Sequence, residues 1–334
     1  MSALELTDVV VDYERRGGGR VRAVAGASID VERGQIVGLV GESGCGKSTL
    51  ARAAVGLVRP TSGSIAFEGR EIVPLGRRAR PRDLARLQLV FQIPYASLNP
   101  RRRVGAQIAD ALDTLDLVPA AARPARVREL CELVGLPATA AGRFPHEFSG
   151  GQRQRIAIAR TLAADPSVIV LDEPLASLDA SAQAQLANLL VNLSRELGLG
   201  LLLISHDLAI VRHVADVVSV MYLGRMVETG STETLWKQPL HPYTESLINA
   251  IPHPDGSGFL PEALPGEVPD PGQPPSGCRF HPRCPYAFAR CSVEDPTLVT
   301  LTGGRAAACW LQPEGASAAS PAERARLVAG AEVQ

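Results

Sequence analysis

Residues 41–48 (GESGCGKS) constrain the fold more than any other part of this 334-residue chain, because they match the pattern G-x-x-x-x-G-K-[ST]. Glycines allow the backbone to wrap so that consecutive N–H groups point inward at the phosphates of a nucleotide. The apolar segment Ile36–Val40 precedes the motif and a helical pattern begins at Ser48. A structural glycine turn is the alternative, but a strand before and a helix after favour a phosphate-binding loop.

The side chains of the loop suit particular parts of a nucleotide. Lys47 supplies a compact positive charge for the phosphates, and the Ser48 hydroxyl can ligate Mg²⁺. Cys45 has no evident base partner that would make it a nucleophile, so we interpret it as a small residue that fits the loop. The residues assigned to nucleotide binding here are Gly41, Ser43, Gly44, Cys45, Gly46, Lys47, Ser48 and Thr49.

Short apolar segments alternate with helical patterns through the first 240 residues, as in an α/β fold. Residues 168–171 and 201–204 are apolar on both faces and are predicted to be buried strands. The leucines between them predict one face of a helix; they are Leu186, Leu189, Leu190, Leu193 and Leu197. This succession predicts a βαβ unit of a parallel sheet. Residues 101–141 are rich in Ala, Leu and Arg at helical spacing and predict a helical insertion.

Asp172 and Glu173 follow the predicted strand 168–171. A carboxylate at the C-terminal end of a strand beside a phosphate loop is placed to hold Mg²⁺ through water, which is the role predicted for Asp172. Hydrolysis needs a general base or a water-orienting group near the γ-phosphate, and Glu173 suits that role. Without a phosphate loop, a solvated turn would be the plainer interpretation of this pair.

Charge and hydropathy exclude several classes of protein. The chain has 35 acidic residues and 34 lysines and arginines, and its net charge of −1 argues against a main role in coating nucleic acid or an anionic membrane. No run of 18 apolar residues occurs, so no membrane-spanning helix is expected. The first residues, MSALE, lack a basic segment followed by an apolar one, so no secretory signal is expected.

The segment Ser149-Gly150-Gly151-Gln152 resembles the signature motif of the ATP-binding cassette (ABC) ATPases. Phe148 precedes it where the family usually has leucine, and it preserves an apolar residue. Other family elements stand in the same order; they are a Q-loop glutamine at Gln92, a D-loop aspartate at Asp179, a switch histidine at His206 and an adenine-stacking aromatic at Tyr13. The resemblance covers about residues 3–250.

This resemblance implies a P-loop α/β core with an antiparallel β subdomain, and a helical subdomain over about residues 93–165 that carries the signature. It also implies that the signature, as a second anion-binding surface, faces the γ-phosphate held by the opposite subunit. ATP then joins a head-to-tail dimer, and hydrolysis releases it. The nucleotide assigned to the phosphate loop is accordingly ATP.

The resemblance also assigns roles in catalysis. Glu173, His206 and Gln92 are the expected catalytic residues, and Ser48, Gln92 and Asp172 are the expected ligands of Mg²⁺. Plainer interpretations remain for three residues; they are a polar loop residue for Gln92, a core histidine for His206 and a half-buried strand tyrosine for Tyr13.

Longer strings indicate a branch of the family. Residues 91–101 (FQIPYASLNPR) resemble the Q-loop region of the oligopeptide/dipeptide/nickel importer ATPases, although Ile93 stands where Asp or Asn is common. Two further segments resemble the C-terminal extension of that family: 240–244 (LHPYT) and 275–285 (PSGCRFHPRCP). Within the family, the chain resembles the second of the two ATPase subunits that usually occur together. We therefore expect an ATPase domain over 1–245 and this extension over 246–334.

That branch implies an ATPase that powers import of oligopeptides, dipeptides or a related solute. The implied partners are a second ABC ATPase in a heterodimer, two transmembrane permease subunits and an extracytoplasmic solute-binding protein, with no nucleic acid. The implied location is peripheral, at the cytoplasmic face of the cell membrane. A non-transport ABC ATPase of DNA repair or translation is the alternative. A P-loop kinase with a metal module is contradicted by the signature and by His206.

Four cysteines of the extension form a candidate metal centre; they are Cys278, Cys284, Cys291 and Cys309. Intervals of 5, 6 and 17 residues separate them, so no C-x-x-C pair occurs and an ordinary zinc ribbon is disfavoured. A reducing cytoplasm disfavours disulfides, and a small proline-rich module gains folding energy from a metal. Some members of the importer family carry a [4Fe–4S] cluster here, and the pattern resembles theirs. We predict such a cluster, with zinc or free thiols as alternatives.

Overall fold

Two β-sheets form the framework of the molecule in the computed structural model, which describes residues 2–15, 18–74, 81–92, 98–251, 264 and 266–312. The smaller sheet is antiparallel, with strand order β2-β1-β4-β5. Its strands are β1 (Ser2–Glu14), β2 (Arg20–Glu32), β4 (Ser62–Phe67) and β5 (Arg70–Glu71). This sheet is the antiparallel subdomain expected beside the P-loop core.

The larger sheet has the strand order β11-β12-β10-β9-β3-β8-β7-β6. Neighbours from β9 to β6 are parallel, and those from β9 to β11 are antiparallel. The bounds are β3 (Ile36–Val40), β6 (Leu87–Val90), β7 (Val168–Asp172), β8 (Gly200–Ser205), β9 (Val217–Tyr222), β10 (Arg225–Ser231), β11 (Val299–Thr300) and β12 (Ala306–Ala307). The three buried strands predicted from sequence are β3, β7 and β8, side by side at the centre.

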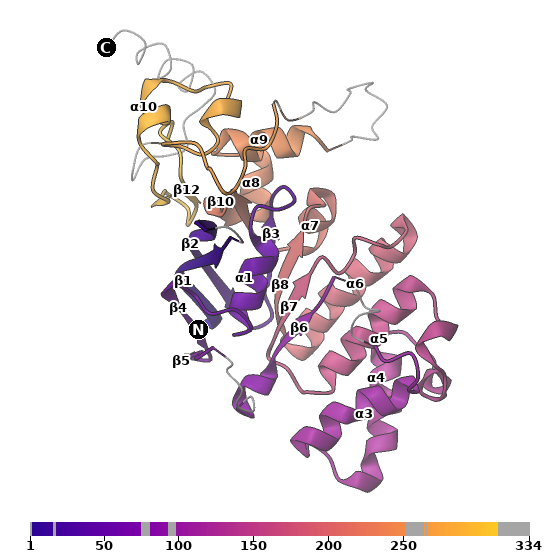
Figure 1. Cartoon of the computed structure of the whole chain (residues 1–334). Helices are drawn as coiled ribbons and strands as arrows, with labels where there is room; N and C mark the ends of the chain where they lie inside the picture. Colours follow the sequence, from indigo (N-terminus) through magenta and orange to yellow (C-terminus); the bar gives the residue numbers. More distant parts are fainter. Residues whose placement is uncertain are drawn as a thin grey trace, which may run out of the picture.

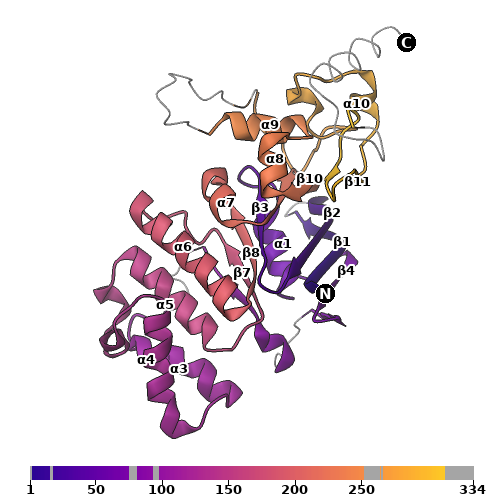
Figure 2. The same ribbon diagram turned by 180° about the vertical axis from the view of Figure 1, so that it is seen from behind.

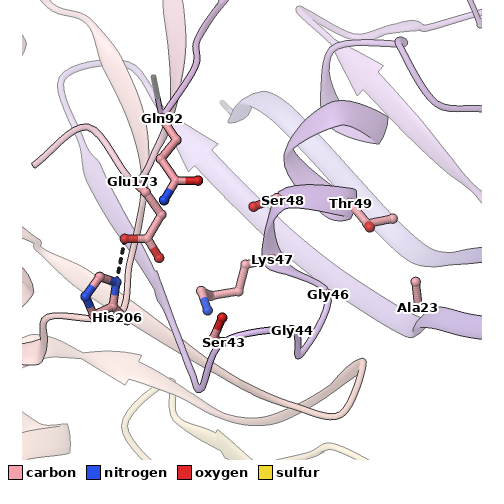
Figure 3. A pocket seen from close by; sticks show the side chains of 10 residues that line it. All are labelled: Ala23, Ser43, Gly44, Gly46, Lys47, Ser48, Thr49, Gln92, Glu173 and His206. Carbon is pink, nitrogen blue, oxygen red and sulfur yellow. Dashed lines mark hydrogen bonds and ion pairs between the residues drawn. The ribbon is translucent and has the colours of Figure 1, made fainter. Parts of the chain in front are cut away.

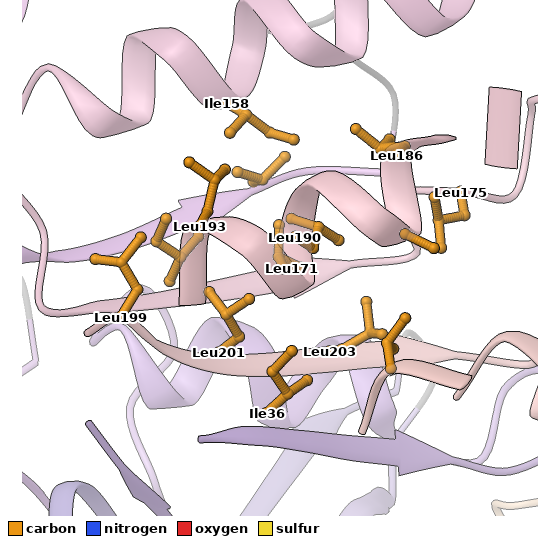
Figure 4. Packing of buried hydrophobic residues seen from close by; sticks show 14 of the residues in the cluster. Ile36, Ile158, Leu171, Leu175, Leu186, Leu190, Leu193, Leu199, Leu201 and Leu203 are labelled. Atoms are coloured by element: carbon orange, nitrogen blue, oxygen red, sulfur yellow. The ribbon is translucent and has the colours of Figure 1, made fainter. Parts of the chain in front are cut away.

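Both faces of these central strands are buried, which explains why their sequences do not alternate with polar residues. On β8, Leu201 and Leu203 pack with the helices, whereas Leu202 and Ile204 pack toward α1 (Lys47–Ala54) and the smaller sheet. Figure 4 shows the helix side of this core, where Leu190 and Leu193 lie over the sheet.

The predicted leucine face belongs to α6 (Ala180–Leu197), with one exception. Leu186, Leu190 and Leu193 are buried and Leu189 packs against the core, but Leu197 is 47% exposed. Leu197 is the last helical residue, and the chain then turns away through Gly198 in a left-handed conformation. Helical periodicity therefore overestimated the buried face by one residue.

The remaining helices form two groups at opposite ends of the molecule (Figure 1). One group is the predicted helical insertion, with α3 (Val104–Leu115), α4 (Arg123–Leu133) and α5 (Gly150–Leu162). The other comprises α8 (Thr232–Lys237), α9 (Pro242–Asn249) and α10 (Ala289–Val293). Figure 2 shows α7 (Leu208–Val214) and α6 between them, packed along the larger sheet. No helix in the described part of the chain is long and apolar enough to cross a membrane.

The C-terminal segment continues the larger sheet rather than standing apart from it. Its strand β12 pairs with β10 through Glu228 and Ala307. Glu228 is fully buried, and its carboxylate accepts hydrogen bonds from the backbone N–H groups of Leu240 and His241 and from Arg305. Burial raises the pKa of this carboxyl group. The segment is therefore anchored in the core. Ile93 and residues 313–334 lie outside the described part.

Candidate active site at the carboxyl edge of the parallel sheet

The predicted site residues gather where the parallel strands end. The phosphate loop follows β3, Gln92 follows β6, Glu173 follows β7 and His206 follows β8. Parallel strands present their carboxyl ends at one edge, which is where α/β sheets bind ligands. A cavity of about 450 Å³ opens there (Figure 3). Its lining residues are Ala23, Ser43, Gly44, Gly46, Lys47, Ser48, Thr49, Gln92, Glu173 and His206.

Two glycines of the phosphate loop are required by its shape. Gly41 and Gly46 have φ angles of 154° and 110°, in the region that side chains rarely adopt. A Cβ at Gly41 would collide with the carbonyl oxygen of Met221, and one at Gly46 with that of Ala23. The loop therefore runs against two other strands, and neither of these two positions has room for a side chain.

Lys47 is the only lysine or arginine among the described residues that line the cavity. Lys47 is 5% exposed, and its Nζ donates to the carbonyl oxygens of Gly41 at 2.8 Å and Glu42 at 3.0 Å. These bonds hold the ammonium group inside the loop, where it faces the predicted position of the phosphates (Figure 3).

The two carboxylates differ in their surroundings. Asp172 is 4% exposed and accepts a hydrogen bond from Ser48 Oγ at 2.8 Å, so the two predicted Mg²⁺ ligands are in contact. Burial raises the pKa of Asp172 above its usual value. Glu173 lines the cavity, and its Oε2 lies 2.7 Å from Nδ1 of His206 (Figure 3).

Glu173 also has an unusual backbone. Its φ angle of 50° lies in the left-handed region, which costs a residue with a side chain of order 1 kcal/mol. Its N–H donates to the carbonyl oxygen of Ile204 on β8 at 3.0 Å, which fixes this conformation. The strain aims the carboxylate into the cavity. Because a left-handed glutamate depends on contacts with the rest of the fold, no pattern of neighbouring residues indicated it.

Tyr13 and Thr49 mark one side of the site. The Tyr13 ring, near the end of β1, is 40% exposed, and its hydroxyl lies 3.5 Å from Thr49 Oγ1. Tyr13 does not line the cavity as described, whereas Thr49 does. The partly exposed Tyr13 therefore lies beside the start of α1, close to the nucleotide-binding residues.

The signature residues lie elsewhere, at the start of α5. Ser149 is the N-cap, and its hydroxyl accepts from the N–H of Gln152 while Gln152 Oε1 accepts from the N–H of Ser149. Ser149 and Gly150 are exposed, and none of residues 149–152 lines the cavity. Asp179 caps α6 by accepting from the N–H of Ala182 at 2.8 Å. The molecule thus has a phosphate loop and, apart from it, an exposed helix start that carries the signature residues.

The four cysteines line one small apolar cavity of about 10 Å³. Burial raises the pKa of Cys278 to about 11 and that of Cys284 to about 12. Among the described residues, no group of three or more His, Cys, Asp or Glu side chains is arranged to hold a metal ion. The arrangement therefore does not support the predicted iron–sulfur cluster.

Cys45 gives a prediction about chemical modification. Cys45 is 4% exposed, and burial raises the pKa of its thiol. We expect a thiol reagent to block ATP binding by its bulk, slowly at neutral pH and faster as pH rises, because the thiolate is the nucleophile. ATP binding after timed exposure measures the effect. The Cys45→Ser protein should bind ATP and resist the reagent; equal sensitivity would contradict this assignment.

Known proteins match this fold and sequence. Residues 24–176 match the family described as ABC transporter, and residues 227–291 match the oligopeptide/dipeptide transporter C-terminal region. The cbiO1 subunit of the cbiONQ ABC transporter complex from Clostridium perfringens superposes with a TM-score of 0.61 at 27% identity, over 71% of this chain and 91% of that chain. An ATP-binding cassette dimer with ADP and Pi in a post-hydrolysis state, 24% identical, has a TM-score of 0.60 over 69% of this chain and 98% of that chain.

The fold and site define a P-loop NTPase with an ABC nucleotide-binding domain. A probable peptide ABC transporter ATP-binding protein of Sinorhizobium fredii is 47% identical over 94% of this chain and 90% of its own length. A putative peptide import ATP-binding protein of Brucella abortus is 49% identical over 91% of this chain and 92% of its own length. The chain belongs to the ABC transporter ATP-binding proteins that carry this C-terminal region. It is an ATPase that uses ATP with Mg²⁺, as predicted.

Proposed function

We propose that this chain hydrolyses ATP to power the import of oligopeptides or dipeptides by a membrane ABC transporter. The observation that carries the proposal is the match of residues 227–291 to the oligopeptide/dipeptide transporter C-terminal region. The two relatives from Sinorhizobium and Brucella, similar over nine-tenths of the chain, are named for peptide transport or import.

The cavity supports a division of labour within the ATPase site. Lys47, the loop N–H groups and the start of α1 bind the phosphates of ATP. Ser48 and Asp172, with Gln92, would hold Mg²⁺, which neutralises phosphate charge when bound. Glu173 accepts the proton of the attacking water, and its contact with His206 orients the carboxylate. Tyr13 stacks on adenine.

The second half of the site is proposed to come from another ATPase subunit. Residues 149–152 and the D-loop residue Asp179 are available for this, because the signature does not line the cavity of its own chain. A Cβ on Gly150 would lie 3.6 Å from the side chain of Leu178, the residue before Asp179, so the signature lies next to the D-loop. In this arrangement ATP lies between two subunits.

The remaining partners and boundaries follow from the importer. The chain would be one half of a heterodimer of ATPases that sits on two permease subunits, with an extracytoplasmic solute-binding protein delivering the peptide. It would lie peripherally at the cytoplasmic face of the membrane. The proposed ATPase domain spans 1–245, with its helical subdomain at about 93–165, and the extension spans 246–334.

A role in DNA repair or translation is less favoured, because such ABC ATPases usually have long coiled-coil insertions or two cassettes in one chain. The longest helix in the described part of the chain is α6, with 18 residues. Co-purification from detergent-solubilised membranes, with mass spectrometry, tests the choice. We expect two multi-span permeases and a second cassette ATPase. Recovery from the soluble fraction with ribosomal or repair proteins would overturn the transport function and leave the ATPase.

We also propose that the four cysteines hold an iron–sulfur cluster, on the chemistry of their thiols alone. Four thiols line one apolar cavity, which is the ligand type that such clusters use, but the cavity must widen to admit one. Purification without oxygen, followed by absorption spectra and iron analysis, tests it. Brown protein that loses its iron when the four cysteines are replaced would support a cluster. Colourless, iron-free protein would end the proposal, and bound zinc would favour the alternative.

A further inference from the structure

One arginine of the C-terminal segment reaches the phosphate loop. Arg283 lies in the 3-10 turn His281–Arg283, 241 residues after Glu42. Its Nη1 and Nη2 donate to the two carboxylate oxygens of Glu42 at 2.8 and 3.0 Å. The arginine side chain is 3% exposed and that of Glu42 is 20% exposed. A two-bonded pair of this kind fixes relative orientation as well as distance.

Glu42 is held at each of its polar groups. Its carboxylate binds Arg283, and its N–H donates to the hydroxyl of Tyr243 on α9 at 2.9 Å. Its carbonyl oxygen accepts from Lys47 Nζ at 3.0 Å. Glu42 is the second residue of the phosphate loop. Arg283 and Tyr243, which lie outside the ATPase motifs, therefore hold the start of the loop and the carbonyl group that binds Lys47.

The groups that hold Glu42 are themselves fixed by packing. Tyr222, Tyr243 and Phe280 are fully buried, with ring centroids 4.6 to 5.3 Å apart. Arg283 lies 5.8 Å from the centre of the Tyr222 ring and donates to the Tyr222 hydroxyl at 3.3 Å. Such contacts leave the guanidinium little freedom to move away from the loop.

A second contact runs from the same segment to the other end of the loop. Arg279 donates to the carbonyl oxygen of Leu223, in the turn between β9 and β10. The next residue of that turn, Gly224, donates its N–H to the carbonyl oxygen of Cys45 at 2.7 Å. The C-terminal segment therefore supports the phosphate loop at Glu42 directly and at Cys45 through the turn.

We propose that Arg283 is a positioning residue for ATP, through which the C-terminal segment sets the shape of the phosphate loop and its affinity for the nucleotide. Arg283 does not line the ATP cavity, and it reaches the phosphate loop through its two hydrogen bonds to Glu42. This inference rests on the ATPase site of the proposed function, but not on the identity of the transported solute.

The test compares the ATP dissociation constant of the purified full chain with its thermal midpoint without nucleotide. Arg283→Gln and Glu42→Gln should each weaken ATP binding about 10-fold, since each breaks a charge-assisted pair that orients the loop. The double variant should bind no more weakly than the worse single variant, because the two residues act as a unit. Arg283→Lys, which keeps the charge and loses the fork, should recover part of the affinity.

Arg290→Gln is the matched control. Arg290 lies in the same segment, but it pairs with the exposed Glu294 at 2.8 Å and does not contact the loop. The Arg290→Gln protein should bind ATP with the affinity of the wild type. An Arg283→Gln protein with wild-type affinity and only a lower thermal midpoint would overturn the inference, as would equal losses in Arg290→Gln. If Arg283→Gln does not fold, Arg283→Lys and the double variant decide by the same criteria. A wild-type chain that binds no ATP would overturn the proposed function itself.

Discussion

Replacement of Glu173 by glutamine should lower ATP hydrolysis in the assembled transporter by about 10²–10⁴-fold, the usual contribution of a general base. ATP should still bind, because the phosphate loop and Lys47 are unchanged. The amide cannot accept the proton of the attacking water, although it nearly preserves the volume of the side chain and can still bond His206. ATP should therefore remain trapped between this chain and the proposed second ATPase subunit, in a dimer stable enough to isolate.

Phosphate release under saturating ATP, with gel filtration of the ATP-loaded protein, measures both effects. Glu233→Gln is a suitable control, since it makes the same chemical change at an exposed residue of α8 whose partner is Lys237. That variant should hydrolyse ATP at the normal rate. A normal rate in Glu173→Gln would show that another group accepts the proton.

Replacement of Lys47 by alanine should weaken ATP binding by about 100-fold or more, because it removes the nearly buried ammonium group that binds the phosphates. The cavity then keeps its N–H groups and the end of α1 but loses its ammonium group. The carbonyl oxygens of Gly41 and Glu42 also lose their donor, so the loop becomes less ordered. Equilibrium dialysis with labelled ATP measures the loss.

The chain supplies its own control for this experiment. Its only other lysine, Lys237, has a side chain that is 72% exposed and lies outside the ATP cavity. Lys237→Ala should bind ATP as the wild type does. If Lys47→Ala bound ATP with unchanged affinity, the phosphate-binding role of residues 41–48 would be contradicted.

Local sequence predicted the parts of the molecule that depend on neighbouring residues. The phosphate loop, Glu173 and His206 directly follow the buried strands β3, β7 and β8. Because those strands are parallel neighbours, their carboxyl ends meet, and the residues that follow them line one cavity. Apolar segments of four or five residues were enough to locate the strands.

Contacts between distant segments could not be predicted in this way. The Glu42–Arg283 pair joins residues 241 positions apart, and only packing of α9 and the C-terminal segment against the core brings them together. The exposure of Leu197 depends on where a helix ends, which periodicity does not define. The spacing of the four cysteines likewise indicated a shared site but not the small size of the cavity they line.

The left-handed backbone of Glu173 has a consequence for attempts to engineer this protein. Glycine or asparagine tolerates that conformation better than glutamate does, so either should make the chain more heat-resistant at this position. A screen that rewards heat resistance alone would therefore drift toward chains that survive and bind ATP but no longer turn it over. Directed evolution of this ATPase should therefore select for ATP hydrolysis in every round, because thermal stability and hydrolysis favour different residues at position 173.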